Sequence, residues 1–168
     1  MTVICVVGLG YIGLPVASML ASRGNDVIGY DVSQRAVDAI NSGHAHFFEP
    51  DLDMLLSAAV GTGRLRAQTE PAQADYFILA VPTPITDAKK PDMSYVDAAA
   101  ASIAPVLKAG STVILESTSP VGTPSGSRRR WRRCGPICAS RCSAARPRPM
   151  SRSRIAPSGS CPARWCAN

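Results

Sequence analysis

The sequence predicts an α/β domain over residues 1–123, built on an open parallel sheet with helices on both faces. In that range, short apolar runs typical of buried strands alternate with segments of helical period. A glycine-rich turn joins the first run to the first helical segment. Such alternation is typical of right-handed βαβ crossovers. We therefore expect a Rossmann-like, doubly wound sheet that lacks its last strand, followed by an irregular tail over residues 124–168.

The glycine-rich turn follows the apolar run of residues 3–7 and contains Gly8, Gly10 and Gly13. In a GxGxxG turn the first glycine permits the sharp bend, the second lets the backbone approach a pyrophosphate, and the third lets the helix pack closely on the sheet. The helix predicted over residues 12–22 would direct its N-terminal N–H groups at the anion. The alternative is a glycine turn that serves packing alone.

A second strand, residues 26–30, ends at Asp31, which lies 18 residues after Gly13. At this place a carboxylate accepts hydrogen bonds from the adenosine ribose of a dinucleotide. The same carboxylate would repel a 2′-phosphate, and no arginine follows it directly. The predicted cofactor is therefore NAD rather than NADP.

The next segments predict the second crossover. A helix is expected over residues 33–41 with Ser33 as its cap, and a further helix from Pro50 to about residue 60, before a short strand at residues 65–68. His44 and His46 have no cysteine or acid at metal-ligand spacing, so we interpret them as loop histidines and predict no metal site.

Residues 76–81 form a strongly apolar run that ends in Pro82-Thr83-Pro84. The two prolines hold Thr83 extended at the carboxyl edge of the sheet, where ligands bind in open parallel sheets. Thr83 is thus a candidate partner of the cofactor's phosphates or ribose, or alternatively a capping threonine in a proline turn.

The last helix and strand of the domain follow. Ser94 is expected to cap a helix from residue 95 to about 107, and residues 112–115 are expected to form a buried strand. The polar loop of residues 116–122 then lies at the same carboxyl edge.

Charge divides the chain in two. Residues 1–123 hold seven basic and all 12 acidic residues, a net charge of −5, whereas residues 124–168 hold 11 arginines and no acid. Cys5 lies in the first strand and is expected to be a buried apolar residue, not a nucleophile. No apolar run reaches the length of a membrane span, so the expected compartment is the cytoplasm.

Five segments identify a family. They are GLGYIGLP, EPDLDMLL, AVPTP, PDMSYVDAAAASIAPVLKAG and ILESTSPVG. Residues 1–123 resemble the N-terminal domain of the nucleotide-sugar 6-dehydrogenases, the UDP-glucose/GDP-mannose dehydrogenase family. The resemblance implies NAD-dependent oxidation of the C6 alcohol of a UDP-sugar to a carboxylate by a homo-oligomer. UDP-N-acetyl-D-mannosamine is the expected sugar, with UDP-glucose or UDP-N-acetyl-glucosamine as alternatives.

The resemblance also implies residue roles. It places Tyr11 and Ile12 at the cofactor phosphates, Asp31 at the adenosine ribose, and Thr83 and Thr118 along the dinucleotide. The family's catalytic cysteine and lysine belong to regions that are not found in this sequence, so no catalytic residue is predicted and this chain alone is expected to be inactive.

The tail, residues 124–168, is rich in Arg, Ser, Pro and Cys and has no aliphatic period. Shifting the reading frame by one base, with permitted synonymous codons, lets residues 154–163 read AYCPERVLPG and residues 134–139 read LRPDLR, strings typical of this family after STSPVG. We therefore interpret the tail as out of frame. The alternative is a basic arm that binds nucleic acid through phosphates. The cysteine spacing has no partner histidines and does not predict zinc.

Overall fold

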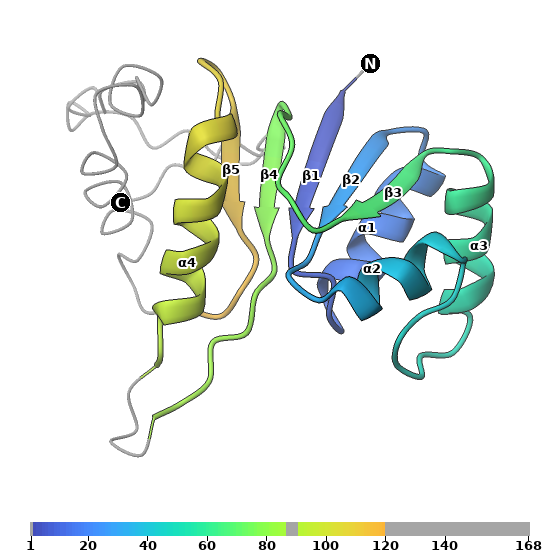
Figure 1. Cartoon of the computed structure of the whole chain (residues 1–168), viewed down its shortest axis with the longest axis horizontal. Coiled ribbons are helices and arrows are strands. Elements are labelled where there is room, and N and C mark those ends of the chain that lie inside the picture. Colours follow the sequence, from blue (N-terminus) through green and yellow to red (C-terminus); the bar gives the residue numbers. More distant parts are fainter. Residues whose placement is uncertain (1, 87–90, 120–168) are drawn as a thin grey trace, which may run out of the picture.

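The computed structural model describes residues 2–86 and 91–119. These residues form one five-stranded sheet, in which all strands run in the same direction (Figure 1). The strands are β1 (Val3–Val7), β2 (Asp26–Tyr30), β3 (Leu65–Gln68), β4 (Tyr76–Leu79) and β5 (Thr112–Leu115). Their order across the sheet is β3-β2-β1-β4-β5. From β1 the chain first adds β2 and β3 on one side, and then adds β4 and β5 on the other side of β1. The predicted Rossmann-like sheet is confirmed, because this is the strand order of that fold.

Helices cover both faces of the sheet. They are α1 (Gly13–Ser22), α2 (Gln34–Asn41), α3 (Leu52–Gly61), α4 (Ser94–Ile103) and the 3₁₀ turn η1 (Ala104–Val106). The first three belong to the right-hand half of Figure 1, and α4 lies beside β5 in the left-hand half. The sheet is therefore doubly wound, as the alternation of strands and helices predicts.

The two hydrophobic cores follow from the alternation of side chains along β1. Ile4 and Val6 pack with residues of α1, α2 and α3 on one face. Cys5 and Val7 pack with residues of α4 on the other face. Since successive side chains of a strand point to opposite faces, a wholly apolar strand can supply both cores.

Two predicted helix ends are wrong by a few residues. The helix expected from Pro50 begins at Leu52, because Asp51 adopts a left-handed backbone with a φ of 63°. The helix expected to reach residue 107 ends at Ile103 and continues as η1. Pro105 lies in that turn and has no N–H to donate, so the α-helical pattern cannot continue.

The predicted caps differ in outcome. Ser33 caps α2 as expected, because its hydroxyl accepts the Ala36 N–H at 3.3 Å. Ser94 is not a cap but the first residue of α4, and its N–H is accepted by the Asp92 carboxylate at 2.9 Å. That hydrogen bond holds the pKa of the Asp92 carboxyl below its usual value. The N-cap of α4 is Met93, and the Asp92 carboxylate just before it provides the acceptor for the first N–H of the helix.

The remaining corrections concern β4 and β5. β4 ends at Leu79 and not at Val81. Pro82 and Pro84 follow, and proline has no N–H to donate to a neighbouring strand. β5 was expected to be buried but is half exposed, and its Ile114 side chain is 38% exposed. It pairs with β4 alone in the described sheet, and α4 packs against only one of its faces.

Some predictions concern residues that the structure does not describe. The domain boundary at residue 123 and the whole tail lie beyond residue 119. Among the described residues no helix is both long and apolar enough to cross a membrane. In the same part of the chain, histidine, cysteine and acidic side chains do not gather into a group that could hold a metal ion.

Candidate cofactor-binding site

The glycine turn links the end of β1 to α1 at the carboxyl edge of the sheet. Gly8 has a φ of 89°, and a Cβ there would lie 2.8 Å from the Ala80 carbonyl oxygen of the neighbouring strand end. A Cβ on Gly13 would lie 1.8 Å from the Gly8 carbonyl oxygen. Both positions therefore require glycine, one for the backbone conformation and both for close packing.

Gly10 differs from the other two glycines. A Cβ at this position would meet nothing within 4 Å, so the fold itself does not demand glycine here. The open space above Gly10 is where the backbone could approach a ligand. The Gly10 carbonyl accepts the Leu14 N–H at 3.0 Å, so the N–H groups before Leu14 lie at the start of the helix, where donors have no partner inside the helix.

Tyr11 and Ile12 occupy this helix start, and their side chains are exposed by 69% and 57%. The structure thus directs both side chains away from the core. Partial positive charge at a helix N-terminus favours a bound anion, and this arrangement suits the diphosphate of a dinucleotide. Their contacts with phosphate stay predictions.

Asp31 follows β2 and lies against the glycine turn. One carboxylate oxygen, Oδ2, accepts the Leu9 N–H at 2.8 Å, and the other, Oδ1, accepts the Ser33 N–H at 2.9 Å. Each oxygen retains capacity for a further hydrogen bond, because a carboxylate oxygen accepts two. Asp31 is therefore fixed in place beside the turn and can still accept a ribose hydroxyl.

Thr83 and Thr118 lie in the turns that follow β4 and β5. Thr83 is half buried and Thr118 is exposed. Between them, the Ser117 hydroxyl donates to the Val81 carbonyl oxygen at 2.6 Å, which joins the two turns. The structure thus brings both threonine-bearing turns to the same edge as Gly10 and Asp31, because all five strands are parallel.

Three supporting residues escaped the sequence analysis. Ser117 ties the two turns together, and the missing side chain of Gly29 in β2 makes room for Leu9, since a Cβ there would lie 2.7 Å from a Leu9 methyl carbon. Phe47 contacts Tyr11, with ring centroids 4.3 Å apart. Only the glycine could have been noticed, as an interruption of an apolar strand.

The cysteine and the two histidines that the sequence analysis considered take the places it predicts. Cys5 is fully buried in β1, and burial raises the pKa of its thiol to about 11, so it stays protonated and inert at neutral pH. His44 and His46 are both exposed, as expected for loop residues. The Cys5 prediction of a buried apolar residue is confirmed.

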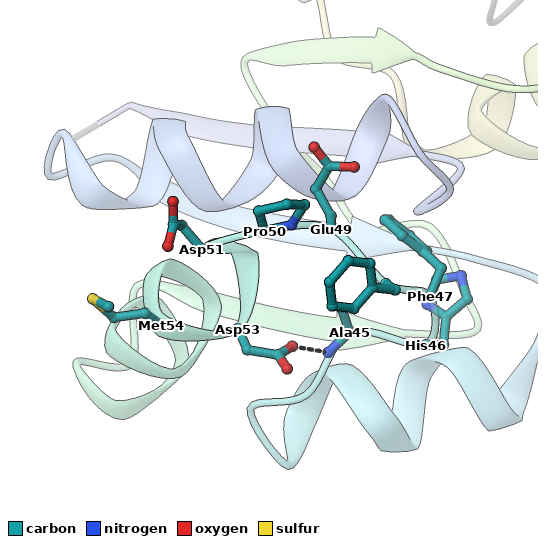
Figure 2. Close-up of a pocket in the computed structure, with 9 residues that line it drawn as sticks. Ala45, His46, Phe47, Glu49, Pro50, Asp51, Asp53 and Met54 are labelled. Atoms are coloured by element: carbon teal, nitrogen blue, oxygen red, sulfur yellow. Dashed lines mark hydrogen bonds between the residues drawn. The ribbon is translucent and has the colours of Figure 1, made fainter.

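A hollow of about 490 Å³ lies beside the site, between the segment after α2 and the start of α3 (Figure 2). It is lined by Ala45, His46, Phe47, Phe48, Glu49, Pro50, Asp51, Asp53 and Met54. The Asp53 carboxylate accepts the Ala45 N–H at 2.7 Å and so closes one wall of the hollow. This hollow does not include the glycine turn, but its Phe47 touches Tyr11 of that turn.

Comparison with known families identifies the domain that carries this site. Residues 2–131 match the NAD binding domain of the UDP-glucose/GDP-mannose dehydrogenase family. The chain belongs to this family. NAD is accordingly the cofactor of the domain, as the sequence predicts. The open backbone at Gly10 and the anchored Asp31 carboxylate fit an NAD diphosphate and ribose.

Curated relatives within the dehydrogenase family are similar over the same region. The chain is 66% identical over 119 residues to the NDP-N-acetyl-D-galactosaminuronic acid dehydrogenase of Ralstonia nicotianae, which covers 71% of this chain and 28% of the relative. It is 58% identical over 120 residues to the UDP-N-acetyl-D-mannosamine dehydrogenase of Escherichia coli K12, with 71% and 29% covered. The chain therefore spans less than a third of the length of these relatives.

Solved structures of family dehydrogenases share the fold. The UDP-N-acetyl-mannosamine dehydrogenase of Pyrococcus horikoshii superposes with a TM-score of 0.75 at 40% identity, over 79% of this chain and 32% of that one. The corresponding enzyme of Staphylococcus aureus gives a TM-score of 0.71 at 42% identity, over 73% and 30%. The dehydrogenase family is thus supported by both sequence and fold.

Proposed function

We propose that this chain supplies the NAD-binding part of a nucleotide-sugar 6-dehydrogenase that oxidises the C6 alcohol of UDP-N-acetyl-D-mannosamine to a carboxylate. The observation that carries the proposal is the glycine turn, which is held by the Asp31 carboxylate at 2.8 Å and is open above Gly10. The named relatives from E. coli and P. horikoshii support the sugar.

In this proposal the residues of the chain bind and orient the cofactor. The N-terminal N–H groups of α1 around Tyr11 and Ile12 face the diphosphate, and Asp31 accepts hydrogen bonds from the adenosine ribose. Thr83 and Thr118 lie along the dinucleotide. Bound NAD supplies hydride acceptance, while the sugar and the nucleophile are held by parts of the dehydrogenase outside residues 1–119.

A second sugar is favoured by one observation. The relative from R. nicotianae, at 66% identity, carries a name that refers to N-acetyl-D-galactosaminuronic acid. UDP-N-acetyl-D-galactosamine is therefore the second candidate substrate. The two sugars differ in configuration at C2, which bears the acetamido group, and at C4, which bears a hydroxyl. Residues outside the cofactor domain would read both positions, so this chain's cofactor site serves either sugar.

A chimera tests the function. Residues 1–119 replace the matching segment of the E. coli dehydrogenase, and NADH formation is followed with each UDP-sugar. We expect turnover by the chimera and none by the chain alone. A folded chimera that binds no NAD would refute the cofactor assignment, and turnover by the chain alone would refute the division of roles.

We further propose that residues 124–168 arise from a shifted reading frame. Sequencing the gene tests this, because an in-frame continuation with a cysteine-bearing substrate domain is expected downstream. The competing nucleic-acid arm predicts RNA or DNA binding that weakens steeply with salt and is lost when residues 124–168 are deleted. A gene with no such in-frame continuation would refute the frameshift proposal, and nucleic-acid affinity unchanged by the deletion would refute the arm.

A further inference from the structure

Tyr11 is exposed by 69%, yet its ring is not free in solution. It lies against the ring of Phe47, with centroids 4.3 Å apart and planes tilted by 37°. Phe47 comes from the segment after α2, 36 positions further along the chain. Aromatic pairs at this separation attract each other beyond the simple burial of their area.

Phe47 is itself held from two sides. The ring of His46 meets it edge to face, with centroids 4.9 Å apart and planes at 85°. Phe47 also packs against the core formed by α1, α2 and α3. The hydrogen bond between Ala45 and Asp53 anchors this segment to the first turn of α3 (Figure 2). Its neighbour Phe48 is 88% exposed, so the two phenylalanines differ sharply.

We propose that Phe47 is a positioning residue for cofactor binding, which fixes the Tyr11 ring beside the phosphate-binding turn. This inference rests on the proposed function, since it takes Tyr11 as a neighbour of the diphosphate. A tyrosine that rotates freely must be ordered when a ligand arrives, and that ordering lowers affinity. Phe47 orders the ring before the ligand binds.

The geometry also explains why the segment after α2 matters to a site that is built on β1 and α1. Tyr11 stands at the helix start, where the N–H donors face the anion, and its ring reaches the segment that lines the hollow. Motion of that segment would move the Tyr11 ring, which lies beside the phosphate-binding turn. The hollow's wall and the cofactor turn are therefore coupled through one ring pair.

The test compares Phe47→Met with Phe48→Met in the full chain, by calorimetric titration with NAD. Methionine keeps the apolar volume but removes the ring. Ordering one side chain corresponds to about a twofold to tenfold change in affinity. We expect Phe47→Met to weaken NAD binding by about that factor and Phe48→Met to leave it unchanged. Phe47→Tyr keeps an aromatic ring at position 47 and should bind NAD as tightly as the unaltered chain.

A double-mutant cycle distinguishes positioning from a general structural effect. Tyr11→Leu removes the partner ring, so Phe47→Met should cause little further loss of NAD affinity in that background. Equal NAD affinity in Phe47→Met and the unaltered chain would overturn the inference but leave the proposed function standing. Losses of NAD affinity that simply add in the double variant would have the same consequence. Absence of NAD binding by the unaltered chain would overturn both. If Phe47→Met does not fold, Phe47→Leu is measured under the same criteria.

Discussion

Replacing Asp31 by asparagine should weaken NAD binding about tenfold to a hundredfold. The aspartate accepts backbone N–H groups at 2.8 Å from Leu9 and at 2.9 Å from Ser33, and in the proposed complex also a ribose hydroxyl. Asparagine has only one acceptor oxygen, and its amide would face a donor. Hydrogen bonds to a charged group contribute about 1.5–3 kcal/mol, and each 1.4 kcal/mol is a factor of ten in affinity.

Asp75 offers a matched control. Its carboxylate accepts the Val3 N–H of β1 at 3.0 Å, which is the same kind of bond at the opposite edge of the sheet. Calorimetry on Asp75→Asn should therefore give the NAD affinity of the unaltered chain. Asp31→Asn should also narrow the preference for NAD over NADP, since the charge that repels a 2′-phosphate is gone. Equal NAD affinity in the two variants would refute the assignment of Asp31 to the ribose.

Three further predictions concern stability, each measured by denaturant unfolding. Gly13→Ala should destabilise the fold by at least about 1–3 kcal/mol, because its Cβ would lie 1.8 Å from the Gly8 carbonyl oxygen. Gly61→Ala is the control and should not destabilise the fold, because a Cβ there meets nothing within 4 Å. Burial raises the pKa of the Cys5 thiol from 9.0 to about 11, so the unfolded chain loses this proton at lower pH than the folded chain. The free energy of unfolding should therefore fall by about 3 kcal/mol as pH rises from 9 to 11, and an equal pH dependence in Cys5→Ala would contradict this. Ser117→Ala should cost about 1 kcal/mol by leaving the Val81 carbonyl oxygen without its donor, and an unchanged midpoint would contradict the link between the two turns.

The parts of the fold that the sequence predicts well are those governed by local spacing. Gly8 and Gly13 are five residues apart, and the need for both comes from one turn and its helix. The fixed period of strands likewise allows all five to be recognised. The Asp31 position follows from the length of one βαβ unit, which the helix and strand geometry set.

The predictions that are wrong or missing depend on contacts between distant segments. Burial of β5 depends on what covers each face, which its own sequence does not report, and Ile114 is half exposed. The bond from Ser117 to Val81 joins residues 36 positions apart, and the Tyr11–Phe47 pair does the same. Single-sequence patterns do not encode such pairs. The Ser94 cap prediction is wrong because α4 already begins at Ser94, whose N–H is accepted by the Asp92 carboxylate. The helix start predicted at Pro50 is wrong because Asp51 occupies the N-cap position of α3.

Gly10→Ala tests whether the glycine turn receives the NAD diphosphate. A Cβ at Gly10 meets no atom of the protein within 4 Å, so the variant should unfold at the same denaturant concentration as the unaltered chain. The same methyl group would occupy the space in which the diphosphate approaches the backbone. Calorimetric titration of both proteins with NAD should show binding by the unaltered chain and none by Gly10→Ala, whereas equal affinity in the two proteins would show that the diphosphate does not bind above Gly10.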